Sequence, residues 1–300
     1  MKLEWTGVIP AITTPFNEDL RVDHAFLAEH AAWLVESGAT GLVPCGSLGE
    51  GSTLSGTERR QVIETCVRAV GDRVPIVPGI AALSTADAVQ MARDAASLGC
   101  RGLMVLPPYA YSTDWREMKA HVGAVLSATQ LPCLLYNNPV AYKTDFVPEQ
   151  IAELARDYES LEAVKESTTD VRRVMAIRAL VGARLKVLMG VDDAIVEGLR
   201  AGAVGWIAGL VNAFPVESVA LCRYVGEGKR EAEDLYKWFL PLLRMDTVPK
   251  FVQLIKLVQE KVGRGSARVR PPRLLLEGQE LQGAVATIEQ ALRARPRISG

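Results

Sequence analysis

The sequence predicts an α/β fold, a (β/α)8 TIM barrel with a C-terminal helical extension, and three observations support it. Eight short apolar or β-branched runs recur between residues 7 and 212. Amphipathic stretches with helical spacing separate these runs. The chain has 300 residues, which suffice for such a barrel plus an extension.

The eight runs are too short for core helices, and most are bounded by Gly or Pro. Their near-continuous apolar character is typical of parallel strands buried on both faces. The predicted strands span residues 7–14, 41–47, 75–80, 102–107, 132–137, 161–167, 185–191 and 205–212. Because eight strands alternate with helices through short connections, a closed barrel is favoured over an open doubly wound sheet.

The stretches between the strands predict amphipathic helices, because apolar residues recur in them at helical spacing. The clearest three carry Phe26, Leu27, Ala31, Leu34 and Val35; then Ala86, Val89, Met91, Ala92 and Ala95; then Met118, His121, Val122, Val125 and Leu126. The eighth helix is predicted at residues 216–224. Residues 1–224 are therefore the expected barrel and catalytic domain.

The segment 225–300 lacks strand alternation, low complexity and a linker, so we expect a helical extension that packs on the barrel. Its periodic stretches predict helices at residues 230–243, 247–262 and 279–294. Pro249 lies near the start of the second of these helices, where proline is tolerated.

Chemistry in such barrels is found at the C-terminal ends of the strands. Polar or glycine-rich segments follow five of the predicted strands, at residues 45–50, 107–111, 136–139, 165–167 and 190–193. A lysine, a tyrosine, a hydroxyl group and glycines therefore converge on one face of the barrel. Imine chemistry on a 2-oxo acid requires such a set.

Lys165 is the candidate nucleophile. It ends a largely apolar run, where poor solvation lowers a lysine pKa and favours the neutral amine. A lone lysine at a strand end more often extends its ammonium to the surface, which is the alternative interpretation. As nucleophile, Lys165 attacks the C2 carbonyl or cyclic imine, and the protonated Schiff base eases bond cleavage or proton loss next to it.

Tyr136 is the candidate general acid/base, and the turn after the second strand is the candidate carboxylate site. Gly46 lets the backbone approach the substrate, so the N–H groups of Ser47 and Leu48 and the Ser47 hydroxyl can donate to its carboxylate. A core tyrosine and an ordinary turn are the alternatives. Their joint appearance at successive strand ends favours a site.

The motifs at residues 46–50 (Gly-Ser-Leu-Gly-Glu), 136–139 (Tyr-Asn-Asn-Pro) and 164–167 (Val-Lys-Glu-Ser) resemble those of the dihydrodipicolinate synthase / N-acetylneuraminate lyase superfamily. These barrel enzymes form Schiff bases as class I aldolases do, and the similarity runs over almost the whole chain. The resemblance implies that Lys165 is the Schiff-base lysine, Tyr136 the proton-transfer tyrosine and Ser47 the carboxylate-binding hydroxyl. It also implies that the backbone carbonyl of Ile207 faces the substrate.

Departures from the resemblance argue against the lysine-pathway synthase. Leu48 stands where those synthases carry a second hydroxyl residue, and Ala141 where they carry an arginine that binds a second carboxylate. Tyr142 or Lys143 is an alternative source of that contact. A family tyrosine donated across a subunit interface falls near Ala110, and its neighbours on either side are further substrate-binding candidates, Tyr109 and Tyr111.

Segments 136–142, 246–250 and 269–273 are most similar to a bacterial branch of hydroxyproline catabolism, the 1-pyrroline-4-hydroxy-2-carboxylate deaminases. This resemblance implies conversion of that cyclic imino acid to 2,5-dioxopentanoate with loss of ammonia. Only one carboxylate needs recognition, which fits the missing arginine. A pyruvate-dependent aldolase or 4-hydroxy-tetrahydrodipicolinate synthase remains the alternative, and so does a non-catalytic barrel that binds a small acid.

Composition predicts a cytoplasmic enzyme with no nucleic-acid or membrane partner. The net charge of −1 favours neither partner, five scattered cysteines indicate reduced thiols, and no signal peptide begins the chain. The uncharged run at residues 201–215 is too short to span a bilayer. Family resemblance implies a homotetramer.

The sequence also predicts that no metal and no cofactor is needed beyond the covalent Schiff base. The three histidines lack ligand-pair spacing, and Asp192 is expected to cap the helix that follows it. No glycine-rich loop follows the seventh or eighth strand, which argues against a phosphate site. A metal-assisted barrel is kept as the alternative that chelator sensitivity would favour.

Overall fold

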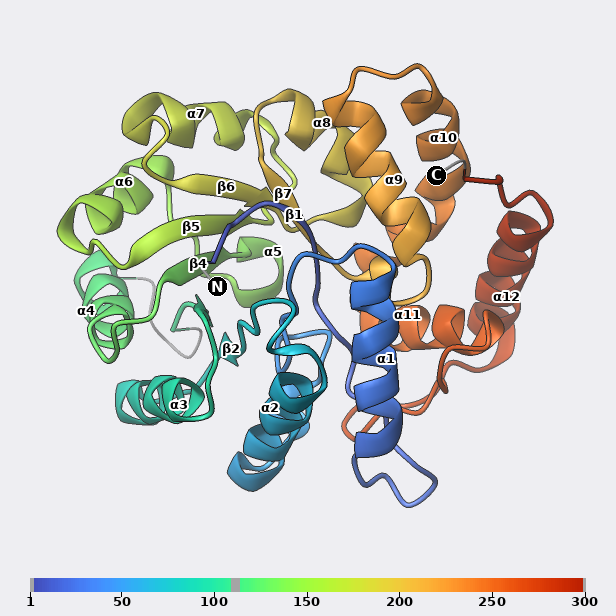
Figure 1. The fold of residues 1–300 in the computed structure, drawn as a ribbon, viewed down its shortest axis with the longest axis horizontal. Helices are drawn as coiled ribbons and strands as arrows, with labels where there is room; N and C mark the ends of the chain where they lie inside the picture. The colour runs from blue at the N-terminus through green and yellow to red at the C-terminus, as the bar shows by residue number, and fades with distance from the viewer. Residues whose placement is uncertain (1–2, 109–113, 299–300) are drawn as a thin grey trace.

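The computed structural model describes residues 3–108 and 114–298, and these form a parallel sheet that curls into a barrel (Figure 1). The sheet order is β1-β7-β6-β5-β4-β3-β2, and every pairing is parallel. The strands are β1 (Gly7–Pro10), β2 (Gly79–Ile80), β3 (Leu103–Val105), β4 (Cys133–Asn137), β5 (Leu161–Glu166), β6 (Lys186–Met189) and β7 (Gly205–Ala208). The predicted α/β barrel is confirmed.

Residues 42–44 close the barrel in place of a regular strand. Val43 bridges Ala11, and Leu42 bridges Ile76, both in parallel. Val43 N donates to Pro10 O at 2.8 Å, and Gly79 N donates to Pro44 O at 2.9 Å. The predicted strand 41–47 is therefore in its expected place between the strands on either side.

Several strands are shorter than predicted, and prolines and turns explain the difference. β2 covers only the end of the predicted run 75–80, because Pro75 and Pro78 have no N–H to donate to a ladder. β7 ends at Ala208, and the rest of the predicted run 205–212 turns into the 3₁₀ helix η3 (Leu210–Asn212). Apolar runs therefore located the strands but not their ends.

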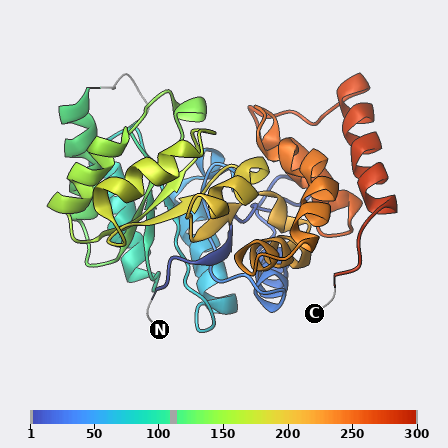
Figure 2. The ribbon, with the colours of Figure 1, turned by 90° about the horizontal axis from the view of Figure 1, so that it is seen from above.

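Helices cover the outside of the sheet (Figures 1 and 2). The outer helices are α1 (His24–Glu36), α2 (Gly56–Val70), α3 (Thr85–Ser97), α4 (Trp115–Leu126), α6 (Pro148–Asp157), α7 (Arg172–Val181), α8 (Ile195–Arg200) and α9 (Pro215–Gly226). Short helices sit in the loops: η1 (Gly51–Thr53), α5 (Pro139–Tyr142) and η2 (Asp192–Ala194). Polar N-caps fix several starts, as where Ser55 and Glu58 form a capping box on α2.

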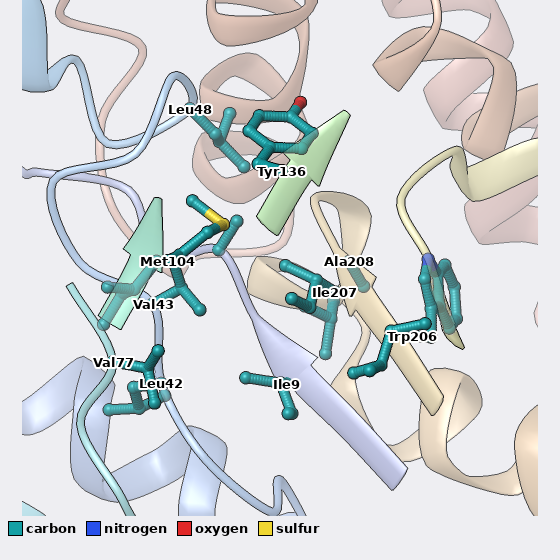
Figure 3. Close-up of a cluster of buried hydrophobic side chains, with 14 of the residues drawn as sticks. Ile9, Leu42, Val43, Leu48, Val77, Met104, Tyr136, Trp206, Ile207 and Ala208 are labelled. Atoms are coloured by element: carbon teal, nitrogen blue, oxygen red, sulfur yellow. The ribbon is translucent and has the colours of Figure 1, made fainter. Parts of the chain in front are cut away.

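Apolar side chains from several strands fill the barrel interior. Ile9, Leu42, Met104 and Ile207 are all almost completely buried in one cluster (Figure 3). Tyr136 lies at the opposite end of that cluster from Leu42 (Figure 3). The barrel interior is therefore a packed core.

The C-terminal extension comprises α10 (Glu231–Leu243), η4 (Arg244–Asp246), α11 (Phe251–Lys261) and α12 (Gly278–Arg293). α10 packs on α9, α11 packs on η3, and α12 lies outermost (Figure 2). The predicted helix 247–262 begins only at Phe251, because residues 247–250, which follow η4, form a turn that contains Pro249. This turn brings residues 246–249 to the strand ends.

Within residues 3–108 and 114–298, no helix is long and apolar enough to cross a membrane.

Candidate functional site

A cavity of about 400 Å³ opens beyond the C-terminal ends of the strands, and we call it the strand-end cavity. Six candidate residues line it, namely Gly46, Ser47, Leu48, Tyr136, Lys165 and Ile207. The extension supplies part of the wall, because residues 246–249 and Phe251 line the cavity too. Tyr109 and Tyr111, the other two candidates, lie outside the described residues.

Lys165 extends from β5 into the cavity and is only 6% exposed. Its Nζ lies 4.2 Å from the centroid of the Tyr136 ring, and within the described chain it makes no hydrogen bond and no ion pair. Burial lowers the pKa of this amine to about 8, although the carboxylates of Asp246 and Asp192 act in the opposite direction. The neutral, nucleophilic form of Lys165 is therefore much more populated near neutral pH than it is for a solvated lysine.

Gly190, at the end of the neighbouring strand β6, makes room for this lysine. A Cβ on Gly190 would lie 2.5 Å from Lys165 Cε and 2.0 Å from Ser167 Oγ. Any other residue at position 190 would therefore displace the Lys165 side chain. Sequence reasoning placed this glycine at a strand end but gave it no role, since the contact depends on the register of β5 against β6.

Tyr136 comes from β4 and pairs with Lys165 across the sheet. Asn138 Nδ2 donates to Tyr136 Oη at 2.9 Å. Burial, together with the nearby Asp246 carboxylate, raises the pKa of the Tyr136 hydroxyl to about 12. The phenol is therefore protonated at neutral pH, so it can donate a proton beside the Lys165 amine.

The turn at Gly46–Leu48 offers free hydrogen-bond donors to the cavity. The N–H groups of Ser47 and Leu48 find no acceptor in the described chain. The Ser47 hydroxyl hydrogen-bonds to the Tyr142 hydroxyl, so Tyr142 faces this turn. The Leu48 side chain is buried and forms an apolar wall. Such a group of donors suits one carboxylate.

The described cavity wall offers no second cationic clamp. Ala141 lines the cavity from α5, where an arginine would be needed for a bidentate contact. Lys143 Nζ instead donates to Val140 O at 3.0 Å, at the exposed end of its own helix. Among the described lining residues, Lys165 is the only lysine or arginine.

The sequence predicted that Asp192 caps the helix after it, but its side chain makes no such contact. Its buried carboxylate accepts hydrogen bonds from Trp206 Nε1 at 2.9 Å, Gly209 N at 3.1 Å and Leu210 N at 2.7 Å. It therefore holds the turn between β7 and η3. The prediction was wrong because unpaired N–H groups of a distant turn are closer to this carboxylate than those of η2.

Asp246 is the acidic residue that sequence reasoning missed. It lines the cavity from η4, whereas all the candidate residues come from the barrel. Its segment carried a family resemblance, but no periodicity places an extension residue at the strand ends. Elsewhere in the described chain, no cluster of three His, Cys, Asp or Glu residues is arranged to hold a metal.

The comparisons agree with this geometry. The model of the dihydrodipicolinate synthetase family matches residues 4–291. A 4-hydroxy-tetrahydrodipicolinate synthase from Geotalea daltonii is 34% identical over 270 residues, which cover 89% of this chain and 91% of the relative. The relative of that name from Methanopyrus kandleri is 32% identical and covers 91% of each chain.

Solved structures give the same result. A putative dihydrodipicolinate synthetase from Pseudomonas aeruginosa superposes with a TM-score of 0.91 at 30% identity, covering 96% of this chain and 100% of that one. YagE, a prophage protein of this family from E. coli K12 solved with pyruvate, gives 0.90 at 26% identity, covering 96% and 99%. With a match over almost the whole chain and a buried lysine at the strand ends, this protein belongs to the dihydrodipicolinate synthetase family of Schiff-base-forming lyases.

Proposed function

We propose that this lyase converts 1-pyrroline-4-hydroxy-2-carboxylate to 2,5-dioxopentanoate and ammonia. One observation carries the proposal: the described cavity wall presents one amine and one carboxylate-binding turn, with Ala141 where a second carboxylate would need a cationic clamp. The substrate class that fits is a small 2-oxo or cyclic 2-imino acid with a single carboxylate.

The substrate carboxylate binds at the turn after residues 42–44. The free N–H groups of Ser47 and Leu48 and the Ser47 hydroxyl support this placement. Lys165 and Tyr136 then face C2 and C3 of the substrate, while the Ile207 carbonyl and the apolar Leu48 complete the pocket. Tyr109 and Tyr111 remain candidates for a further contact.

The chemistry begins when the neutral Lys165 amine adds to C2 and the ring nitrogen leaves as the C5 amine. The protonated Schiff base acidifies C3, and proton loss gives an enamine that expels the 4-hydroxyl as water. Tyr136 moves protons at this face. Proton loss from C5 gives a dienamine, and protonation of this dienamine at C3 and C4 leaves a second, protonated imine at C5. Hydrolysis of both imines by two water molecules releases ammonia, the product and the free lysine.

Condensation with pyruvate, as in a 4-hydroxy-tetrahydrodipicolinate synthase or another pyruvate-dependent aldolase, is the second candidate function. The names of the relatives at 32–34% identity favour it. The leucine at position 48 and the alanine at position 141 weigh against the synthase, because they remove a hydroxyl and a carboxylate clamp from the described wall.

The purified protein should be assayed in parallel with 1-pyrroline-4-hydroxy-2-carboxylate and with pyruvate plus aspartate semialdehyde. We expect the wild-type protein to form ammonia and 2,5-dioxopentanoate in equal amounts from the pyrroline. A Lys165→Ala variant should form neither product, although its melting temperature should equal that of the wild type. Condensation product without ammonia release would replace the deaminase with the synthase.

We also propose that the protein works in the cytoplasm as a homotetramer. All five cysteines are free thiols, which suits a reducing compartment. Large apolar side chains at Leu83, Leu274 and Leu275 are mostly exposed, which indicates surfaces that are covered in an assembly. Light scattering on the eluting protein tests this, and a monomer mass at micromolar concentration would contradict it.

A further inference from the structure

Asp246 is the only acidic residue among the described residues that line the strand-end cavity. It ends η4 in the C-terminal extension, and its carboxyl lies directly against Gly209, just after β7. A Cβ on Gly209 would lie 2.1 Å from Asp246 Oδ1. Glycine at position 209 therefore lets an extension carboxyl reach the same cavity as Lys165.

The Asp246 carboxyl has no protein partner among the described residues. Throughout residues 3–108 and 114–298 it accepts no hydrogen bond and forms no ion pair, and the half-buried side chain lines the cavity. Neighbouring Asp192 differs, since its oxygens are occupied by Trp206 and two backbone N–H groups. Of the two carboxyls near Lys165, Asp246 is therefore the one that can bind a ligand.

The charges around Asp246 favour its protonated form. Burial raises its pKa well above the ordinary value, and the carboxylates of Asp192 and Asp193 raise it further, while Lys165 lowers it. Lys165 itself has a pKa of about 8. The cavity thus combines a proton donor with an amine that is partly neutral, a pairing typical of acid–base catalysis at neutral pH.

We propose that Asp246 is a further catalytic residue, which protonates the ring nitrogen of a cyclic 2-imino acid as Lys165 opens the ring and then holds the resulting ammonium group. This inference rests on the proposed function, because a substrate with a ring nitrogen is what gives the carboxyl its task. It explains why an acid at this position needs no protein partner.

The step balances in atoms and charge. The neutral Lys165 amine adds to C2 of the protonated imine, and the bond between C2 and the ring nitrogen breaks with its electrons remaining on nitrogen. One lysine proton and the Asp246 proton move to that nitrogen, and the other lysine proton stays on the Schiff base. A protonated Schiff base, a primary ammonium group and the Asp246 carboxylate result, and no external reactant is needed.

The arrangement also selects the substrate class. After ring opening, the Asp246 carboxylate stabilises the ammonium group at the far end of the substrate chain. A second substrate carboxylate in the same place would be repelled by the ionised Asp246. The Asp246 carboxylate and the lack of a cationic clamp at position 141 both disfavour 2-oxo acids that carry a second carboxylate. Both favour cyclic imino acids with a single carboxylate.

Trapping with cyanoborohydride tests the inference without requiring turnover. The full-length protein is incubated with pyruvate, which has no ring nitrogen, and separately with 1-pyrroline-2-carboxylate, which has one but lacks the leaving hydroxyl. The rate of adduct formation on the Lys165 peptide is measured by mass spectrometry. We expect Asp246→Asn to slow trapping of the pyrroline about 10²-fold or more and not to slow pyruvate trapping, because loss of a carboxylate near Lys165 can only lower the pKa of its amine.

Two variants serve as controls. Asp246→Glu restores a carboxyl and should recover part of the pyrroline rate. Asp234→Asn removes an exposed acid of the extension that does not line the cavity and instead pairs with Lys237 at 3.9 Å, so it should leave both rates unchanged.

Three outcomes would overturn the inference. Equal trapping of the pyrroline by wild type and Asp246→Asn would remove the acid role alone and leave the deaminase standing. An equal loss with both compounds would assign Asp246 to the fold or to Lys165 itself. A wild-type protein that traps pyruvate but not the pyrroline would refute the proposed function and the inference together.

Discussion

At the scale of single residues, two features of its surroundings lower the pKa of Lys165. Neighbouring residues leave room for a buried amine, and no described residue forms an ion pair with it. The side chain is buried, faces the Tyr136 ring at 4.2 Å and forms no ion pair with any described residue. Gly190 supplies the room. Desolvation without pairing therefore lowers the amine pKa.

Replacing Gly190 with alanine should disable the lysine without removing it. The new Cβ would overlap Lys165 Cε, and a displacement of about 1 Å can cost about 10²-fold in rate. Trapping of pyruvate measures the loss. Gly283→Ala is the matched control, because a Cβ there meets nothing within 4 Å. A Gly190→Ala variant that traps pyruvate at the wild-type rate would contradict the packing argument.

The pH dependence of trapping should report the lowered pKa of Lys165. Only the neutral amine attacks, so the rate should rise about tenfold per pH unit below pH 8 and level off above it. Initial rates with pyruvate across this range give the midpoint. A midpoint near the ordinary lysine value of 10.5 would mean that the ammonium is solvated.

Lys165 and Tyr136 could be predicted from the sequence because both lie at the C-terminal ends of predicted strands. Parallel strands in a barrel bring these ends to one face. Asp246 was not predictable in this way. It follows a helix of the extension, and its approach to Gly209 depends on how η4 packs against η2 and the barrel. Local periodicity carries no information on such a contact.

At the scale of elements, the turn that presents Ser47 and Leu48 is held by a buried ion pair from the extension. Glu50 has a left-handed backbone with φ of 51° and is fully buried. Its carboxylate accepts from Lys256 Nζ at 2.5 Å and from Arg270 N at 3.0 Å. The turn at residues 46–48 and α11 therefore form one structural unit.

Glu50→Gln should destabilise the protein by about 3–5 kcal/mol, because it leaves the Lys256 ammonium buried without its counter-charge. Urea unfolding measures the loss. Glu280→Gln, which breaks the exposed pair with Lys250, is the control and should cost at most about 1 kcal/mol. Equal stability of the two variants would show that the buried pair does not hold the turn.

Element types were predictable from the sequence, and their ends were not. The run 41–47 has the composition of a strand, yet only Leu42 and Val43 form bridges, since Pro44 and the prolines at 75 and 78 interrupt the ladder. Residues 247–250 have helical spacing but form a turn at the cavity. Tertiary contacts decided both cases.

At the scale of the whole molecule, barrel and extension build the site jointly. The barrel supplies Lys165 and Tyr136, while the extension supplies Asp246 and the Lys256 contact to Glu50. We propose that residues 225–300 are an obligatory part of the catalytic unit and not an accessory to the domain 1–224. Membership of the family indicates Schiff-base chemistry, and the residues of the cavity wall limit which class of substrate fits.

The central claim is that Lys165 forms a Schiff base with a small 2-oxo or cyclic 2-imino acid. The most direct test is borohydride trapping after separate incubation with pyruvate and with 1-pyrroline-4-hydroxy-2-carboxylate, followed by peptide mapping. We expect a reduced adduct on Lys165 from both compounds, with ammonia released only from the pyrroline. No adduct from either acid, or an adduct on another lysine, would contradict it.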